Sequence, residues 1–167
     1  MLPNTDNQNE PRSLSKLNIS RITEYLYVAA FPKAEHAGAI SNLNVRLIIN
    51  MIFIAPAKVF QKPPFCMLTL RTFDSIFIPI PIRKLVKGVE IALPAIQNDE
   101  SVLIYCRQGR HRSVAMASTI LIAKGYSADD AMQLVSSKRE AADPYAWHIQ
   151  RQIRKFEKKW NNLKNSV

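Results

Sequence analysis

The sequence predicts a single α/β domain with a central, mostly parallel mixed sheet of four or five strands flanked by helices. Three observations support this fold class. The chain has 167 residues, the size of one ordinary domain. Apolar segments of strand length alternate with longer amphipathic segments, which is the order of elements in parallel α/β folds. The run SVLIY at 101–105 shows no polar alternation, as expected of a strand that is buried on both faces.

The predicted elements begin at Ile19. We expect strands at about 26–28, 45–51, 66–70 and 101–105, and helices at about 34–43, 83–97, 113–124, 128–137 and 144–162. Pro94 is expected to bend or shorten the second helix, because proline donates no backbone hydrogen bond. Gly125 suits the position just after the third helix. Residues 1–18 lack periodicity and are polar, so we expect a flexible N-terminal arm before a folded domain at 19–167.

Composition excludes several classes of protein. With 47% hydrophobic and 22% charged residues the chain is neither disordered, collagen-like nor a coiled coil. The longest apolar stretch, 47–57, contains Asn50 and is well short of the roughly 20 residues that span a bilayer. The polar N-terminus does not resemble a signal peptide, so a cytoplasmic protein is expected. Two cysteines are too few for a disulfide scaffold and fit free thiols.

The formal net charge of +10 indicates an anionic substrate or surface as partner. The basic excess is concentrated in residues 58–87 and 138–167 rather than in one basic arm. These segments lack the interleaved aromatic residues of a single-strand binder, so no nucleic acid is expected. A basic surface that serves only solubility remains an alternative for either segment.

The strongest chemical signal is the segment between the buried strand and the third helix, which reads Cys106-Arg107-Gln108-Gly109-Arg110-His111-Arg112-Ser113. A loop that joins a strand to a helix N-terminus aims backbone N–H groups and the helix dipole at one point, which suits a phosphate. The same field and Arg112 favour the thiolate of Cys106, a nucleophile. Arg112 can hold two phosphate oxygens, Gly109 permits the turn, and Ser113 can stabilise the departing sulfur.

The remaining residues of this loop are predicted to contact substrate. Arg107 and Arg110 are expected at the mouth of the cleft, beside Gln108 and Gly109. His111 is expected to line the mouth of the loop, as a substrate contact or as an ordinary surface histidine.

Other candidate residues favour structural roles. The histidines His36, His111 and His148 are scattered without zinc-ligand spacing to cysteine, so no metal site is expected. Cys66 lies in an apolar strand and is predicted to be a buried structural thiol, with a redox role toward Cys106 as the alternative. Helical spacing predicts that a set of apolar residues packs the last helix onto the domain: Tyr145, Trp147, Ile149, Ile153, Phe156 and Trp160.

The pattern Cys106-x2-Gly109-x2-Arg112-Ser113 resembles the signature loop of the cysteine-dependent phosphatases, specifically the dual-specificity branch of these protein-tyrosine-phosphatase-like enzymes. The segments RITEYLYVAAFP, VRLIINM and GYSADDAMQLVSSKR resemble other elements of this family, so the likeness runs from about residue 21 to residue 160. The resemblance implies a mixed sheet flanked by helices, which makes 19–167 a phosphatase catalytic domain.

The resemblance also implies an aspartate that acts as general acid about thirty residues before the cysteine. Asp74 lies 32 positions before Cys106 and is the only acidic residue between Glu35 and Glu90. A turn-forming aspartate is the alternative. Two features depart from the family: Tyr105 replaces the usual histidine before the cysteine, and ADPYAWHIQRQI replaces a Pro-Asn-x-Gly-Phe pattern that braces the loop. Another group must therefore brace it.

The function implied is hydrolysis of phosphotyrosine and of phosphoserine or phosphothreonine in proteins, through a cysteinyl-phosphate and without metal or organic cofactor. Arg107 and Arg110 resemble residues of relatives that act on phosphoinositides or inositol polyphosphates, which is the first alternative and would make anionic phospholipids partners. Hydrolysis of RNA 5′-phosphates is a more distant alternative. A catalytically weak module that docks phosphoproteins is another, although such a binder needs neither a thiolate nor an acid.

Overall fold

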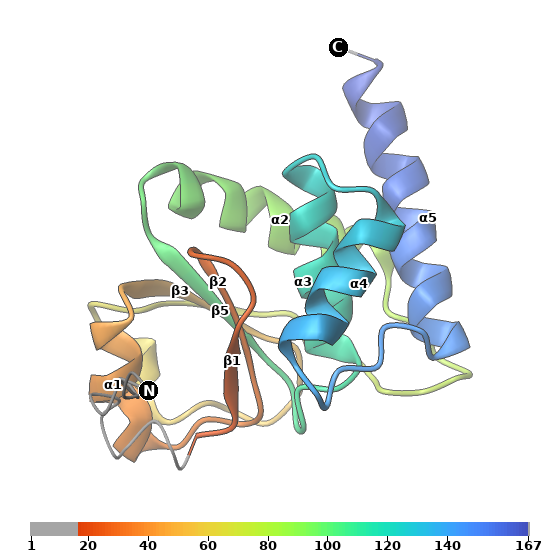
Figure 1. The fold of residues 1–167 in the computed structure, drawn as a ribbon. Helices are drawn as coiled ribbons and strands as arrows, with labels where there is room; N and C mark the ends of the chain where they lie inside the picture. The colour runs from red at the N-terminus through yellow and green to blue at the C-terminus, as the bar shows by residue number, and fades with distance from the viewer. Residues whose placement is uncertain (1–16, 167) are drawn as a thin grey trace, which may run out of the picture.

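The computed structural model describes residues 17–166 and places a five-stranded sheet at the centre of the fold (Figure 1). The strands are β1 (Ile19–Arg21), β2 (Leu26–Ala29), β3 (Val45–Asn50), β4 (Cys66–Thr69) and β5 (Ser101–Tyr105). Their order in the sheet is β1-β2-β5-β3-β4. Only β1 and β2 pair antiparallel, and the other three pairings are parallel. The predicted mostly parallel mixed sheet is thereby confirmed.

Helices cover both faces of the sheet and complete the predicted single α/β domain. They are α1 (Ala37–Asn42), α2 (Ile82–Gln97), α3 (Arg112–Ala123), α4 (Ala128–Lys138) and α5 (Trp147–Lys164), with short 3-10 helices η1 (Ala34–His36) and η2 (Lys58–Gln61). Helix α3 packs against β2 and β5, while α4 and α5 pack on α3; α1 contacts β3 from the other side (Figure 1). None of the helices within residues 17–166 is long and apolar enough to cross a membrane.

The centre of the core lies where β5 meets α3. All five residues of β5 are buried between β2 and β3, which explains the unbroken apolar run SVLIY. Helix α3 is likewise buried along nearly its whole length. It ends at Gly125, whose φ of 109° and N–H bond to the Ile122 carbonyl (2.9 Å) are those of the predicted helix C-terminus. The segment between β5 and α3 is therefore fixed at both of its ends.

Some elements differ from the sequence prediction. The helix expected at 34–43 is divided into η1 and α1, and the last helix begins at Trp147 rather than at Pro144. Helix α2 is not shortened by Pro94 and continues to Gln97. A proline in the last helical turn removes a single donor, which the rest of the helix tolerates. The three-residue β1 was not predicted, because so short a strand shows no periodicity.

The last helix packs as predicted through one stripe of side chains. Ile149, Ile153 and Phe156 are buried, and Phe156 stacks on Trp160 with ring centroids 5.6 Å apart. The prediction is wrong for Tyr145 and Trp147, which are exposed. Tyr145 precedes α5 and Trp147 is its first residue, so neither shares the stripe.

The N-terminal prediction falls mostly outside the structure. Residues 1–16 of the arm predicted at 1–18 lie outside the described residues, so that arm stays a prediction. Leu17 is buried in the core, and the Asn18 carbonyl accepts a hydrogen bond from the N–H of Ala30 (2.9 Å).

Candidate active site

The loop between β5 and α3 closes around the sulfur of Cys106. Gly109 adopts a left-handed backbone with φ 64°. A Cβ at this position would collide with the guanidinium of Arg139 and the carbonyl oxygen of Ala29, so no other residue fits without rearrangement. With that turn, the N–H of Gly109 donates to Cys106 Sγ at 3.2 Å. The sequence predicted that Gly109 permits a turn here, and the backbone adopts that turn.

The surroundings of Cys106 favour its thiolate form. Burial by itself opposes ionisation, but hydrogen bonding from the Ser113 hydroxyl, the backbone N–H groups of Ser113 and Arg110, and the charge of Arg112 outweigh it. Together they hold the pKa of the Cys106 thiol below its ordinary value. The Ser113 Oγ lies 3.2 Å from Cys106 Sγ and is fully buried. The thiol is thus prepared to act as a nucleophile.

Arg112, the first residue of α3, donates a hydrogen bond from one guanidinium nitrogen, while another has no partner among residues 17–166. Its Nη1 donates to the Thr72 carbonyl oxygen at 3.0 Å. Its Nε is buried yet has no hydrogen-bond partner among residues 17–166. Buried donors are rarely left unpaired, so this N–H suits an anionic oxygen held in the loop.

Arg139 braces the loop, and the sequence analysis did not find it. Its Nε donates to the Gly109 carbonyl (2.6 Å), its Nη2 to the Gln108 carbonyl (3.0 Å) and its Nη1 to Ser20 Oγ (3.1 Å). The side chain is almost wholly buried. Arg139 supplies the brace whose family pattern is missing from this sequence. No local signal marks it, because a basic residue after Lys138 at a helix end looks like a solvated one.

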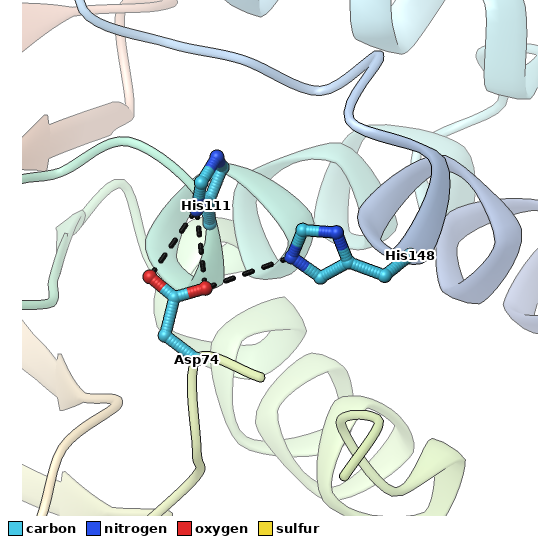
Figure 2. A group of neighbouring side chains, drawn as sticks. All are labelled: Asp74, His111 and His148. Carbon is cyan, nitrogen blue, oxygen red and sulfur yellow. Dashed lines mark hydrogen bonds and ion pairs between the residues drawn. The ribbon is translucent and has the colours of Figure 1, made fainter. Parts of the chain in front are cut away.

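Asp74 reaches the same site from the long segment between β4 and α2. Its two carboxylate oxygens lie 3.1 and 3.2 Å from His111 Nδ1, and one of them lies 3.7 Å from His148 Nε2 (Figure 2). The fold therefore brings Asp74 to the loop that holds Cys106, as the general-acid prediction requires. His111 touches Asp74 directly, whereas the sequence suggested a substrate contact or a surface residue.

Arg107, Gln108 and Arg110 lie exposed on the outer side of the loop. The carbonyl of Arg107 accepts from the N–H of Phe31 at 3.3 Å. Arg110 Nη2 lies 3.5 Å from Asp143 Oδ2, which holds this side chain beside the loop. Their exposure leaves these side chains accessible to solvent, and their contact with substrate stays a prediction.

Tyr105 occupies the position where the family places a histidine. Its ring is buried and meets Phe31 edge to face, with centroids 5.7 Å apart. Its hydroxyl has no hydrogen-bond partner in the part of the chain that the structure describes. Burial raises the pKa of Tyr105, so the phenol stays neutral and adds no positive charge near the thiolate. The lowered pKa of Cys106 therefore comes from the loop and α3.

Two further predictions can be compared with the structure. The prediction that Cys66 is a buried thiol is wrong. Cys66 is exposed because it lies in β4, the edge strand of the sheet. Both Cys66 and Cys106 are free. The scattered histidines gave no reason to expect a metal site, yet ligand atoms of Asp74, His111 and His148 all lie within 4.8 Å of one another. Long-range contacts create this cluster, which spacing along the sequence cannot reveal.

Comparisons with known proteins find relatives by sequence and by fold. No family model matches the chain. Over 51 residues, 30% of this chain, the sequence is 41% identical to dual specificity phosphatase 28 of the mouse, Mus musculus. That match spans only 31% of the mouse protein's length.

Solved structures match nearly the whole described chain. PTPMT1 in complex with PI(5)P superposes with a TM-score of 0.78 at 22% identity, covering 88% of this chain and 99% of that one. Human DUSP28 superposes with a TM-score of 0.74 at 25% identity, covering 86% and 95%. The protein thus has the fold of the protein-tyrosine-phosphatase-like phosphatases. Within that class it resembles the dual-specificity phosphatases.

Proposed function

We propose that the protein is a cysteine-dependent phosphatase that hydrolyses phosphate monoesters through a cysteinyl-phosphate. The observation that carries this proposal is the environment of Cys106. A thiol with a lowered pKa accepts a backbone N–H from Gly109 at the N-terminus of α3, beside the unpaired N–H of Arg112. Nucleophile and anion donors are thus combined in one small loop.

In the first step the Cys106 thiolate attacks phosphorus in line with the ester oxygen. The S–P bond forms as the P–O bond to the leaving group breaks, and Asp74 donates its proton to that oxygen. Arg112 and the loop amides bind the remaining phosphate oxygens and neutralise their charge. The contact with His111 makes this histidine a positioning residue for the carboxyl group.

In the second step water hydrolyses the intermediate. Asp74, now a carboxylate, accepts a proton from the water whose oxygen attacks phosphorus, and the S–P bond breaks. The departing thiolate accepts a hydrogen bond from the Ser113 hydroxyl, 3.2 Å away. Inorganic phosphate is released, and neither step draws on a metal or an organic cofactor.

Replacing the nucleophile tests this mechanism. Cys106→Ser is expected to abolish hydrolysis of an aryl phosphate, because an alcohol of ordinary pKa is not ionised, while inorganic phosphate still binds in the loop. Turnover near the wild-type rate in this variant would remove Cys106 from the mechanism. A wild-type protein that binds phosphate but turns over no aryl phosphate would instead be a binding module.

The substrate class we propose is phosphorylated protein, with phosphotyrosine and phosphoserine or phosphothreonine hydrolysed at the same site. This assignment rests on the resemblance to the dual-specificity phosphatases, which includes the mouse relative's name. Arg112 and the loop amides recognise only the phosphate group, so the loop itself accepts any phosphorylated side chain that reaches it.

An inositol phospholipid is the second candidate, favoured by a specific surface feature. Exposed apolar side chains on the segment that carries Asp74, and two that lie beside this segment, form what we call the apolar rim: Phe73, Ile76, Phe77 and Ile78, with Phe53, whose ring centroid lies 4.7 Å from that of Phe73, and Trp147, which lines the same hollow as Phe77. Phe77 is 86% exposed. Arg151 and Lys155 line the same hollow as Phe77 and Trp147. Apolar and basic side chains together suit an anionic lipid surface, and PTPMT1 has been solved with PI(5)P.

Substitution within the apolar rim separates the two substrate classes. If lipid is the substrate, Phe77→Ser should lower kcat/KM on phosphoinositide in vesicles by roughly 10- to 100-fold, because one inserted aromatic ring contributes roughly 1.5–3 kcal/mol. Hydrolysis of a soluble phosphopeptide should not change. Ile91→Ser is the matched control, since Ile91 is exposed on α2 outside the rim. An equal loss on vesicles and on peptide would favour protein substrates.

A further inference from the structure

The cluster of Asp74, His111 and His148 joins three elements far apart in the sequence: the segment before α2, the loop before α3, and the first turn of α5 (Figure 2). We propose that these three side chains form a zinc-binding site at the edge of the active-site cleft. The ligand atoms are one carboxylate oxygen and one ring nitrogen from each histidine, and all lie within 4.8 Å of one another.

The cluster is arranged around one carboxylate oxygen. Asp74 Oδ1 lies 3.1 Å from His111 Nδ1 and 3.7 Å from His148 Nε2. The other ring nitrogen of His111, Nε2, lies 3.7 Å from Asp143 Oδ2. In the tautomer of His111 that carries its proton on Nε2, Nδ1 presents a lone pair. In that tautomer Nδ1 and the Asp74 oxygens present lone pairs to the same point, where a metal ion can bind them.

The distances fit zinc after a small adjustment. Zinc binds nitrogen and carboxylate oxygen at about 2.0–2.2 Å, which puts ligand atoms of a tetrahedral site roughly 3.3–3.5 Å apart. The two distances from Asp74, 3.1 and 3.7 Å, lie close to this separation. The widest pair, within 4.8 Å, requires the two ligand atoms to approach by up to about 1.5 Å. Asp74 is on an exposed segment and both histidines are partly exposed, so side-chain rotation can supply it.

The donor set and its surroundings select the type of metal. Two imidazoles and one carboxylate suit zinc, whereas calcium and magnesium take oxygen ligands. Asp143 Oδ2 lies 3.7 Å from His111 Nε2, so a small rotation would let it accept the N–H of this ring while Nδ1 binds the metal, an arrangement that orients such ligands. Arg110 Nη2 lies 3.5 Å from Asp143 Oδ2, so this carboxylate also pairs with a cation of its own. Partial exposure leaves a fourth ligand position to water.

Occupation of the site has a consequence for catalysis that rests on the proposed function. A carboxylate coordinated to zinc cannot carry the proton that the leaving group needs. Zinc is therefore expected to inhibit turnover reversibly by occupying Asp74, without reacting with the Cys106 thiolate. His148 neither forms a bond nor transfers a proton in the proposed chemical steps, so replacing it weakens metal binding while leaving every reacting group in place.

Direct binding tests the site independently of activity. Untagged Cys106→Ser protein removes the thiolate as a competing ligand. Zinc at about 100 times its dissociation constant should then raise the melting temperature by roughly 5–10 °C. Adding His148→Gln should weaken zinc binding at least about tenfold, whereas Glu90→Gln, an exposed carboxylate on α2, should have no effect. Equal zinc affinity with and without His148 would overturn the proposal.

Turnover then tests the regulatory role. In wild-type protein zinc should inhibit hydrolysis of an aryl phosphate, and a chelator should restore it. His148→Gln, compared with its own rate in the absence of metal, should need at least about tenfold more zinc for the same fractional inhibition. Equal inhibition of both proteins would place the effect at Cys106 and overturn this role. A wild-type protein without any phosphatase activity would refute the proposed function, while zinc binding by the Cys106→Ser protein would still be measurable.

Discussion

The two halves of the candidate active site are held in different ways. The loop at 106–113 is fixed by a buried strand, a buried helix and the three hydrogen bonds that Arg139 makes to Gly109, Gln108 and Ser20. Asp74 lies on an exposed segment without regular structure, and its side chain meets only His111 and His148. The nucleophile is thus preorganised, whereas the acid depends on a few surface contacts.

This difference suggests a division of labour. A nucleophile and an anion site gain from rigidity, because their hydrogen bonds must already point at the charge that develops in the transition state. An acid that serves substrates of different shapes gains from a segment that can adjust. Substitutions in the loop at 106–113 and substitutions of Asp74 should therefore impair different properties of the protein.

The largest expected effect follows loss of the acid. Asp74→Asn should lower kcat by roughly 10²–10⁴-fold on an alkyl phosphate, whose leaving oxygen needs a proton. An activated aryl phosphate should suffer much less, because its leaving group departs unprotonated. Steady-state kinetics on the two esters measure this ratio. The same loss on both would make Asp74 a structural residue and would place the acid elsewhere.

Replacement of Arg139, which braces the loop at 106–113, is expected to lower the stability of the folded protein. Arg139→Met removes the donors to the buried Gly109 carbonyl and to the partly buried Gln108 carbonyl, so the free energy of unfolding should fall by about 2–4 kcal/mol. Urea denaturation measures it. Arg154→Met is the matched control: Arg154 pairs with Asp129 at the surface, and such pairs contribute about 0–1 kcal/mol. Equal losses in the two variants would mean that Arg139 does not brace the loop.

A smaller effect concerns ionisation of the nucleophile. The Ser113 hydroxyl is the strongest of the groups that lower the pKa of Cys106, so Ser113→Ala should raise that pKa. The fraction of thiolate then falls at any pH below the new pKa. The rate of alkylation by iodoacetate as a function of pH measures the midpoint. A midpoint that does not move would show that Ser113 leaves the thiolate unaffected.

The same contrast explains what the sequence could predict. Cys106, Gly109, Arg112 and Ser113 lie within eight consecutive residues, so strand, turn and helix signals together predict their geometry. The four longer strands and the main helices could likewise be predicted from periodicity. Arg139 could not, because its acceptors on the loop lie 30 and 31 residues away and its other two acceptors, on β1 and β2, lie 119 and 111 residues away.

The part of the candidate site that carries Asp74 could be predicted from the sequence only in part. Asp74 could be selected because acidic residues are absent from its neighbourhood in the sequence and because the family places an acid there. Its contacts with His111 and His148 depend on how α5 packs on α3, which no local pattern encodes. The exposure of Cys66 was missed for a similar reason, since an apolar sequence does not say which strand lies at the sheet edge.

The most direct test of a cysteine nucleophile is to trap the intermediate. Asp74→Asn protein should be mixed with an activated aryl phosphate, quenched in acid within one turnover and digested for mass spectrometry. Loss of the base slows hydrolysis of the intermediate, so one phosphate should be found on the peptide that contains Cys106. Phosphate on another residue, or full turnover with no phosphorylated peptide at any time, would contradict the mechanism.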